Sequence, residues 1–472
     1  MQQSEVRILL QPWTASPSKT KQAVLTIADG LNQSVESIEI KDSQCTAVIN
    51  MDSSLYPTVQ TRDGFSLFST HTGYINRLFK FLGVWYCANS RGLYKQSGAS
   101  WVAVYEYGSA DPNRLWDAAM FFDGSKLYFI DGSLQLRQYD GSTLTTLGAA
   151  RPGSAFIATY MNRFFMAGPN DNLLWYSALR DAADWSSTNK YTGTGKITVE
   201  TQDGEKPTGL TGFNNHVILF KRYTMHKLFG EDTTNFNMTQ PFGVGCISDR
   251  TIVPTRESLY WLGPDGFYDY MGGSAPVRIS DPIKDYIKSI NLAYAQHCVA
   301  GTDGRFVYLS LVTGSATTPN VTLKYDLVNR SWWVESYVAT SFHLDGATMY
   351  YATADGRIMR MGGVTDNGTA INWSIESKPF SEGDETIRKA INRLFVVADI
   401  EPGSTLNIDY AGGTEGGEWT NAYSQTNGSG AVQSIRIPVV VRTPETWRRL
   451  KFYGTGRVKI HRIIREVSRR GN

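Results

Sequence analysis

Cysteine, net charge and long apolar runs are all scarce in this 472-residue sequence. The four cysteines, Cys45, Cys87, Cys246 and Cys298, are widely separated and have no paired spacing, which excludes a zinc ribbon and a CxxC redox motif. We therefore expect four buried free thiols in a protein made in a reducing cytoplasm. The formal net charge is only +2, so no whole-chain signal points to nucleic acid or to a membrane surface.

No stretch has the length and composition of a signal peptide or a membrane span. The N-terminal residues MQQSEVRILLQPW lack a long apolar core. No run approaches the roughly 20 apolar residues that a spanning helix needs. We expect no membrane insertion, and we expect synthesis and first assembly inside a cell.

Spacings that carry catalysis or metal binding are also missing. The six histidines form no His-x-His or His-Glu-x-x-His pair, and no Gly-x-Ser-x-Gly elbow occurs. The Gly-rich stretch GTEGGEWTN (413–421) lacks the Lys and Ser/Thr of a Walker loop. We expect no enzyme activity, no metal and no cofactor. Carboxylates from separate repeats could still meet at a central opening, as in a propeller glycosidase.

Hairpins are what the sequence has in abundance. In SLYWLGPDGFYDYMGG (258–273), aromatic residues that favour a half-buried pleated surface flank Pro264-Asp265-Gly266. This tripeptide supplies a preset φ, an Asx side chain and a glycine, which together predict a tight turn. The stretch is therefore predicted to be a β-hairpin.

The same hairpin pattern occurs seven times along the chain, the 258–273 stretch included. Equivalent points of the seven copies are spaced by about 44 residues on average, the length of a four-stranded propeller blade. We predict an all-β chain with a degenerate seven-bladed β-propeller, the alternative being one or two β-sandwiches. Trp175, Trp261 and Tyr325 should then be buried between strands. The equivalent points are Tyr94, Tyr139, Trp175, Lys227, Tyr268, Tyr325 and Met359.

Three regions are predicted along the chain. Residues 1–62 form an N-terminal β segment, which either closes the propeller or contacts another protein. Residues 63–378 form the propeller, and residues 379–472, which include the polar stretch SEGDETIRK (381–389) near their start, form an antiparallel β-sandwich-like domain. Residues 281–297, DPIKDYIKSINLAYAQH, are the one segment with a helical pattern.

Positive charge is concentrated near the C-terminus. Between Arg442 and Arg470 there are ten Lys or Arg residues against two acids. Alternation with apolar residues predicts that many of them project from one sheet face. This face is either a solvated edge that protects the sheet from aggregation or a surface for phosphate or an acidic partner. The candidate partner- or DNA-facing residues are Arg448, Arg449, Lys451, Arg457, Lys459, Arg462 and Arg465.

Several segments together resemble a known family. SSLYPTVQTRDGF (53–65), LWYSALRDAADWSS (174–187), LTGFNNHVILFKRYTMHKLFG (210–230) and FSEGDETIRKAINRLFVV (380–397) are similar, in pattern and order, to the tail nozzle or tail hub propeller-ring proteins of short-tailed bacteriophages. These are also called packaged-DNA stabilisation proteins. The stretch from the 258–273 hairpin to RISDPIKDYI (278–287) resembles their later blades. The resemblance covers roughly residues 50–470.

This resemblance implies a structural role in a virion. Family members form a homohexameric ring below the portal and adaptor ring, continue the DNA channel, retain packaged DNA and carry tail fibres or spikes. Contact with double-stranded DNA in the channel would be non-specific. The expected function is therefore that of a non-enzymatic phage tail protein, a head–tail connector part acting in DNA ejection and assembled in the host cytoplasm. The alternative is a carbohydrate-binding or glycan-cleaving β-propeller.

Overall fold

The computed structural model describes residues 21–469 except 115, 122, 134, 148–152, 202–203 and 384. A tight turn at 263–266 joins two of its strands. Strands β23 (Leu259–Leu262) and β24 (Phe267–Tyr270) are antiparallel, with Trp261 opposite Tyr268. The Gly263 amide donates to the Gly266 carbonyl at 2.8 Å. The predicted hairpin is confirmed.

Six four-stranded antiparallel sheets follow one another along the chain. Within each sheet the strand order is that of the sequence, because each strand pairs with the next one along the chain. The first three are β6–β9 (Ile75–Phe81, Val84–Asn89, Gly92–Ser97, Ser100–Glu106), β10–β13 (Asp117–Met120, Leu127–Ile130, Arg137–Tyr139, Leu144–Thr146) and β14–β17 (Phe156–Tyr160, Arg163–Ala167, Leu173–Tyr176, Gly195–Thr198). The next three are β18–β21 (Pro207–Phe213, His216–Lys221, Met225–Phe229, Asn237–Phe242), β22–β25 (Val253–Pro254, β23, β24, Val277–Arg278) and β26–β29 (Val299–Thr302, Phe306–Leu311, Val321–Asp326, Ser331–Glu335).

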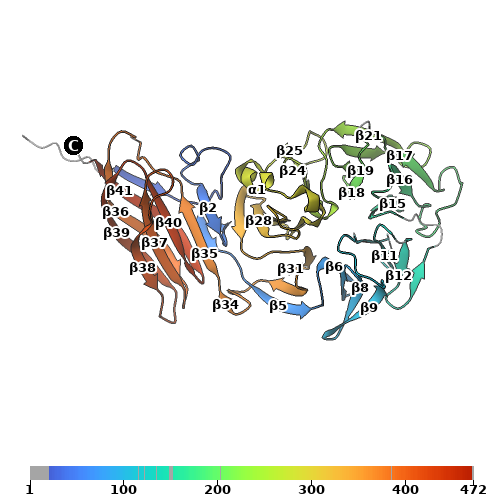
Figure 1. Ribbon diagram of the computed structural model, residues 1–472, viewed down its shortest axis with the longest axis horizontal. Helices are drawn as coiled ribbons and strands as arrows, with labels where there is room; N and C mark the ends of the chain where they lie inside the picture. The colour runs from blue at the N-terminus through green and yellow to red at the C-terminus, as the bar shows by residue number, and fades with distance from the viewer. Residues whose placement is uncertain are drawn as a thin grey trace, which may run out of the picture.

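A seventh sheet joins the two ends of this series. Strands β30 (Ser341–Asp345), β31 (Thr348–Ala352) and β32 (Arg357–Met361) are completed by β5 (Phe65–Thr70), which precedes the six four-stranded sheets in the sequence. The short strands β33 (Thr365–Asp366) and β34 (Thr369–Ala370) extend its edge. In Figure 1 the sheets follow one another around a common centre, and β30 contacts β6. The fold is therefore all-β and propeller-like.

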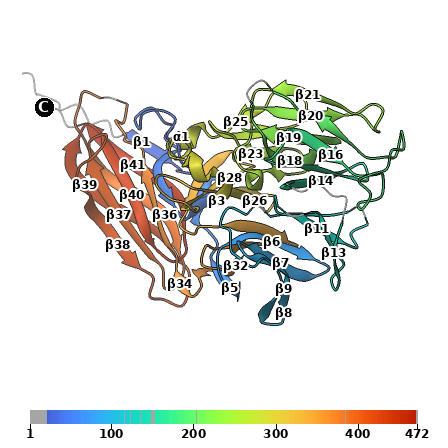
Figure 2. The same ribbon diagram turned by 45° about the vertical axis from the view of Figure 1, so that its right-hand side comes forward.

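The two sheets at the C-terminal end lie beside this propeller-like array (Figures 1 and 2). One has the order β3-β4-β41-β36-β39, with β1 also paired to β41, and the other has the order β2-β35-β40-β37-β38. Apolar residues of both sheets, such as Val396, Ile408, Phe452 and Ile460, belong to one buried cluster. The strands are β1 (Lys21–Leu25), β2 (Cys45–Ile49), β3 (Met51–Leu55), β4 (Thr58–Thr61), β35 (Asn372–Ser377), β36 (Lys389–Ile400), β37 (Thr405–Gly412), β38 (Thr420–Thr426), β39 (Gln433–Glu445), β40 (Arg448–Thr455) and β41 (Val458–Arg469).

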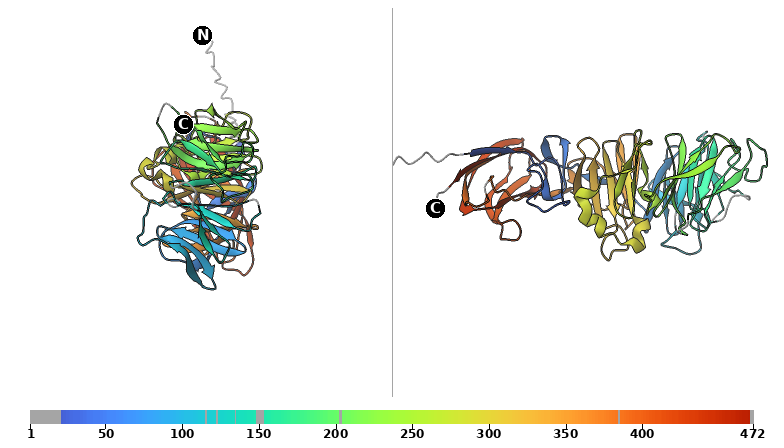
Figure 3. Two further views of the ribbon diagram at one scale, coloured as in Figure 1. Left: turned by 90° about the vertical axis from the view of Figure 1, so that its right-hand side faces the viewer. Right: turned by 90° about the horizontal axis from the view of Figure 1, so that it is seen from above.

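The N-terminal strands belong to these C-terminal sheets. β1 and β4 pair with β41, and β2 pairs with β35. The strand that completes the seventh sheet is β5, which lies just after the predicted N-terminal segment of residues 1–62. Residues 1–20 of that segment lie outside the described residues. Figure 3 shows the C-terminal sheets and the propeller-like array as two parts placed side by side.

Backbone hydrogen bonds connect the two parts through Leu31. The Leu31 amide donates to the Trp332 carbonyl at 2.8 Å on β29, while the Asn32 amide donates to the Cys45 carbonyl at 3.0 Å on β2. Gly30 makes this close approach possible, because its φ is +74° and a Cβ there would lie 2.5 Å from the Trp332 oxygen. Hydrogen bonding therefore runs continuously from the sixth sheet of the array into the C-terminal sheets.

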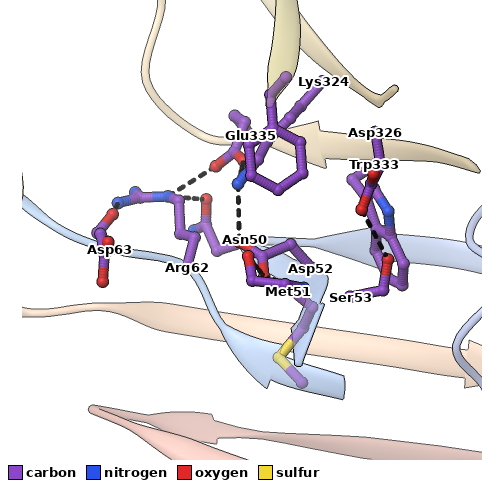
Figure 4. Close-up of polar contacts among 12 residues, drawn as sticks. Asn50, Met51, Asp52, Ser53, Arg62, Asp63, Lys324, Asp326, Trp333 and Glu335 are labelled. Carbon is purple, nitrogen blue, oxygen red and sulfur yellow. Dashed lines mark hydrogen bonds and ion pairs between the residues drawn. The ribbon is translucent and has the colours of Figure 1, made fainter. Parts of the chain in front are cut away.

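A buried charge cluster lies at the same junction (Figure 4). Lys324 of β28 contacts Asp52 of β3 at 2.7 Å and Glu335 of β29 at 3.4 Å. Arg62 contacts Glu335 at 2.7 Å and makes two bonds to Asp366 at 2.7 and 2.8 Å. The side chains of Arg62, Lys324, Asp52 and Glu335 are each at most 6% exposed. Each charge is thus matched inside the protein, as burial of ions requires.

Two expectations are corrected in detail. The helical segment 281–297 is divided into short pieces, of which only α1 (Lys284–Lys288) is α-helical. The flanking 3₁₀ turns are η2 (Asp281–Ile283) and η3 (Leu292–His297), and Ile290 between them bridges to Thr313.

Trp261 and Tyr325 are buried as predicted, but Trp175 is half-buried. The four cysteines are free and buried, as expected.

Candidate functional site

The predicted basic residues do not form one sheet face. Arg448, Arg449 and Lys451 lie on β40, whereas Lys459, Arg462 and Arg465 lie on β41. These strands belong to different sheets. Because the two sheets share one apolar core, their outer faces point in different directions. The expectation of a single basic face is therefore wrong.

Two of the seven cations are buried. Arg448 is 4% exposed and lies on the inward side of β40 with Leu450 and Phe452, stacked over the Tyr410 ring at 5.9 Å. Arg465 is 3% exposed, contacts Glu382 at 3.2 Å and stacks on Phe380 at 3.6 Å.

A register shift explains the inward direction of Arg465. Val397 is opposite Arg462, but its neighbour Ala398 is opposite Ile460, so His461 is the extra residue of a β-bulge. The bulge changes which alternate positions face the core. Before it Val458 and Ile460 are buried, and after it Ile463, Arg465 and Val467 are buried.

Three of the other cations have partners on the protein. Lys451 contacts Glu376 at 2.8 Å, and Arg457 contacts Asp63 at 2.9 Å and Glu401 at 3.8 Å. Arg449 donates to the Gly416 carbonyl and lies 5.0 Å from the Trp419 ring centre. Lys459 is half-buried and Arg462 is exposed. These last two are the members of the set that face solvent on β41.

A second candidate site lies on the axis of the propeller-like array. A cavity of about 550 Å³ is lined by residues from the first strands of all seven sheets. A smaller cavity of about 140 Å³ shares Asp249 and Arg250 with it. These side chains therefore lie where the two cavities meet.

Two carboxylates that line the larger cavity are bound to backbone amides. Asp117 Oδ2 accepts from the Ile157 amide at 2.8 Å, and Asp249 Oδ1 accepts from the Leu210 amide at 3.1 Å. Arg77 of β6 forms an ion pair with Asp117, and its Nη1 lies 3.9 Å from Asp249 Oδ2. Arg77 thus reaches from its own sheet to Asp117 on the next sheet and to Asp249 in a 3₁₀ turn.

Burial dominates the electrostatics of this cluster. It raises the pKa of Asp117, and it raises the pKa of Asp249 to about 7, with repulsion from Asp117 as the next cause. Burial and the nearby Arg250 lower the pKa of His297 to about 4. Asp117 and Asp249 therefore share Arg77 as their close cation. The ionised form of Asp249 is less well stabilised than it would be with a cation of its own.

Sequence reasoning missed Asp117 and Asp249. Asp117 begins strand β10, whereas Asp249 begins the 3₁₀ turn η1 (Asp249–Thr251) before β22, so no spacing links them, and only the tertiary arrangement of the sheets brings them together. Among the residues that the structure describes, no group of three or more His, Cys, Asp or Glu side chains could hold a metal ion. In the same part of the chain, no helix is both long and apolar enough to span a membrane.

Comparison with known proteins finds similarity to solved structures alone. No protein-family model and no curated protein matches the chain. The extracellular domain of a putative one-component system from B. thetaiotaomicron matches with 10% identity and a TM-score of 0.46, covering 70% of this chain and 43% of that one. This chain thus spans less than half the length of that protein. The Pan2 WD40 domain of Neurospora crassa matches with 10% identity and a TM-score of 0.40, covering 64% of this chain and 95% of that domain.

Proposed function

We propose that this chain is a structural protein of a short-tailed bacteriophage, the subunit of a homohexameric tail nozzle or hub ring. In this proposal the seven sheets are the blades of one closed β-propeller, and the two C-terminal sheets are a β-sandwich domain. The ring lies below the portal and adaptor ring, continues the DNA channel, retains packaged DNA and carries fibres or spikes. The protein has no enzyme activity in this role and is located in the virion tail.

The junction between the two parts is the observation that carries this proposal. The Leu31 backbone bridge and the Lys324 charge cluster hold the propeller-like array and the C-terminal sheets together without a flexible linker. Relative motion of two domains is the usual expectation unless their interface is extensive. A rigid two-part block suits a component that must keep a channel aligned with neighbouring rings.

Fewer residues of the basic segment can contact DNA or a partner subunit than the sequence indicated. Buried Arg448 and Arg465 serve the fold, so contact with DNA or a partner subunit falls to Lys459 and the exposed Arg462. Such contacts would be weak and dependent on salt, because exposed charges are screened within about 8–10 Å at ordinary ionic strength. Weak contacts allow DNA to slide through the channel.

A carbohydrate-binding or glycan-cleaving propeller is the second candidate, and the axial carboxylates are the observation that favours it. A glycosidase needs one acid that is protonated near neutral pH and a second carboxylate that is ionised. The pKa of Asp249, raised to about 7, fits the first role. The bonds of Asp117 favour a structural role for it instead, since its Oδ2 accepts from the Ile157 amide and its Oδ1 accepts from Arg77, so both oxygens are occupied.

Negative-stain microscopy of the purified chain tests the proposal. We expect rings of six subunits with a central hole, and mass photometry should give a hexamer. A protein that stays monomeric at micromolar concentration and cleaves an oligosaccharide, with loss of turnover in Asp249→Asn, would contradict the structural role and support the second candidate. Lys459→Ser with Arg462→Ser should leave the subunit folded and weaken DNA retention in particles, scored by nuclease sensitivity.

A further inference from the structure

Lys324 lies between two buried carboxylates at the junction of the two parts (Figure 4). Its Nζ is 2.7 Å from Asp52 Oδ2 and 3.4 Å from Glu335 Oε1, and all three side chains are at most 6% exposed. We call these three residues the junction triad. Lys324 is on β28 and Asp52 is on β3, so a bond between them would join the propeller-like array to the C-terminal sheets.

Aromatic rings keep water away from the ammonium group of Lys324. The Phe306 ring centre is 4.2 Å from Nζ, and Trp333, which is opposite Lys324 on β29, is fully buried. The ion pair is the resting form of the triad, because attraction by Lys324 keeps the pKa of Asp52 low in spite of burial. Burial nevertheless costs both charges their hydration, which brings the neutral amine and acid closer to the ion pair in free energy.

Asp52 Oδ1 accepts two hydrogen bonds from Ser54. The Ser54 amide donates at 2.9 Å and the Ser54 hydroxyl at 2.6 Å. Two donors on one oxygen polarise the carbonyl of a protonated Asp52 and stabilise the negative charge that develops on Oδ1 when an amine attacks Cγ. The oxygen beside Lys324, Oδ2, is then the one that can leave.

Glu335 is placed to move a proton between the reacting atoms. Arg62 holds its Oε2 at 2.7 Å, yet among the described residues neither Glu335 oxygen accepts a hydrogen bond of good geometry. Burial raises the pKa of Glu335 in spite of the attraction to Lys324 and Arg62. A buried carboxylate of this kind can take a proton from Lys324 Nζ and pass it on, as a general base and then a general acid.

We propose that the junction triad forms an intramolecular isopeptide bond between Lys324 Nζ and Asp52 Cγ. One proton moves from the ammonium group to Asp52 Oδ2, and the neutral amine attacks Cγ. Glu335 takes a second proton from Nζ and delivers it to Oδ2, so the Cγ–Oδ2 bond breaks and one water molecule leaves. The ammonium and the carboxylate thus become one amide and one water, and no co-reactant is needed.

Fixed contact between the two groups drives this condensation. Reactive groups that a fold holds in contact reach effective concentrations of about 10⁵ M or more, so amide formation can prevail over hydrolysis. The freshly folded chain holds the ion pair, and the bond forms slowly from it. This inference does not depend on a role in a phage tail.

Mass spectrometry of the intact, denatured full chain tests the proposal. During several days at pH 7, we expect a growing fraction of the chain to lose the mass of one water molecule. A tryptic digest should then contain residues 42–62 joined to residues 306–330, with no cleavage after Lys324. A chain that keeps its full mass would overturn the proposal. A loss of water that the digest places at another site would overturn it as well.

Two variants separate the bond from the ion pair. Glu335→Gln keeps the size of the side chain and should slow bond formation about 100-fold or more, because general acid–base catalysis typically contributes that factor. Lys324→Arg keeps the positive charge without an amine that can attack, so its mass should stay unchanged. An unchanged rate in Glu335→Gln would contradict the role of the triad.

Lys80 and Asp345 are a matched control within the same chain. Their ion pair is 2.8 Å long, but the two side chains are 29% and 33% exposed, so water reaches them. We expect them to stay unlinked in the digest that shows the bond at Lys324. Equal linkage at Lys80 and Lys324 would show that contact alone is sufficient, and would overturn the proposed action of the buried triad.

Discussion

Replacement of Lys324 by Met should loosen the junction between the two parts of the protein. Lys324 is 5% exposed and lies 2.7 Å from Asp52 and 3.4 Å from Glu335. Arg62 still pairs with Glu335 in the variant, so Asp52 is the charge left without a counter-ion. Breaking a buried pair from one side costs about 3–5 kcal/mol.

The pH dependence of this loss gives a sharper test. The attraction of Lys324 holds the pKa of Asp52 below its usual value in spite of burial. Without Lys324, burial alone acts and raises that pKa, so Asp52 can take up a proton in mild acid. The destabilisation by Lys324→Met should therefore be smaller at pH 4.5 than at pH 7.5.

Hydrogen exchange measured by mass spectrometry on peptides covering 45–62 and 321–335 reports the junction directly, without assuming two-state unfolding of the whole chain. The double variant Lys324→Met with Asp52→Asn removes both charges and should recover much of the lost protection. A loss below about 1 kcal/mol in the single variant would refute the reasoning. So would a double variant that is destabilised by the sum of the two single changes.

Four further substitutions test other parts of the fold. Gly30→Ala should open the Leu31 bridge, seen as faster exchange of the Leu31 and Cys45 amides, because it combines a left-handed backbone with a Cβ 2.5 Å from the Trp332 oxygen. Gly304→Ala, where φ is +89° with open space around the Cβ, should cost only the backbone term of about 1–2 kcal/mol. Trp261→Ala should lower the free energy of unfolding by about 3–5 kcal/mol in urea titrations, since Trp261 is fully buried and donates to the Gly245 carbonyl at 2.9 Å; an unchanged midpoint would show that the site relaxes without a cavity. The pKa of Asp249 is raised to about 7, against an ordinary 3.8. Asp249 therefore stabilises the fold in acid. This contribution, at most about 4 kcal/mol, is lost as the pH rises from 4 to 7. The Asp249→Asn variant should not show that loss, with Arg77, Asp117 and Arg250 unchanged around the substituted side chain. The stability of the variant relative to the wild type should therefore increase between pH 4.5 and pH 8. A constant difference in stability would argue against a raised pKa.

The repeat was readable from the sequence because turn chemistry and aromatic strands are local properties. Every one of the seven equivalent points, from Tyr94 to Met359, lies on the third strand of its sheet. The pairing partners of the terminal strands were not readable, since β-pairing over hundreds of residues leaves no mark on spacing. β5 completes the seventh sheet, whereas β1–β4 join the C-terminal sheets.

The same distinction between local and long-range features applies to the residues of the candidate sites. Arg448 alternates in step with Leu450 and Phe452, so all three side chains lie on the same face of the strand. The sequence therefore already indicated an inward side chain for Arg448, and the sequence interpretation overlooked it. The bulge at His461, which turns Arg465 inward, has no such signal, because an inserted residue is visible only against its partner strand. Asp117 and Asp249 meet only through closure of the array, so their cluster belongs to the tertiary structure alone.

The pairing of the first strands with the last has a consequence for biosynthesis. β1 and β4 emerge from the ribosome early, but their partner β41 is made at the very end of the chain, and β5 must wait for β32. Until then these strands have open edges that can pair with other nascent chains. Native closure is therefore post-translational and slow, as expected for contacts between distant residues. A chain shortened before residue 458 would retain the local hairpins and lose the strand that holds both ends together.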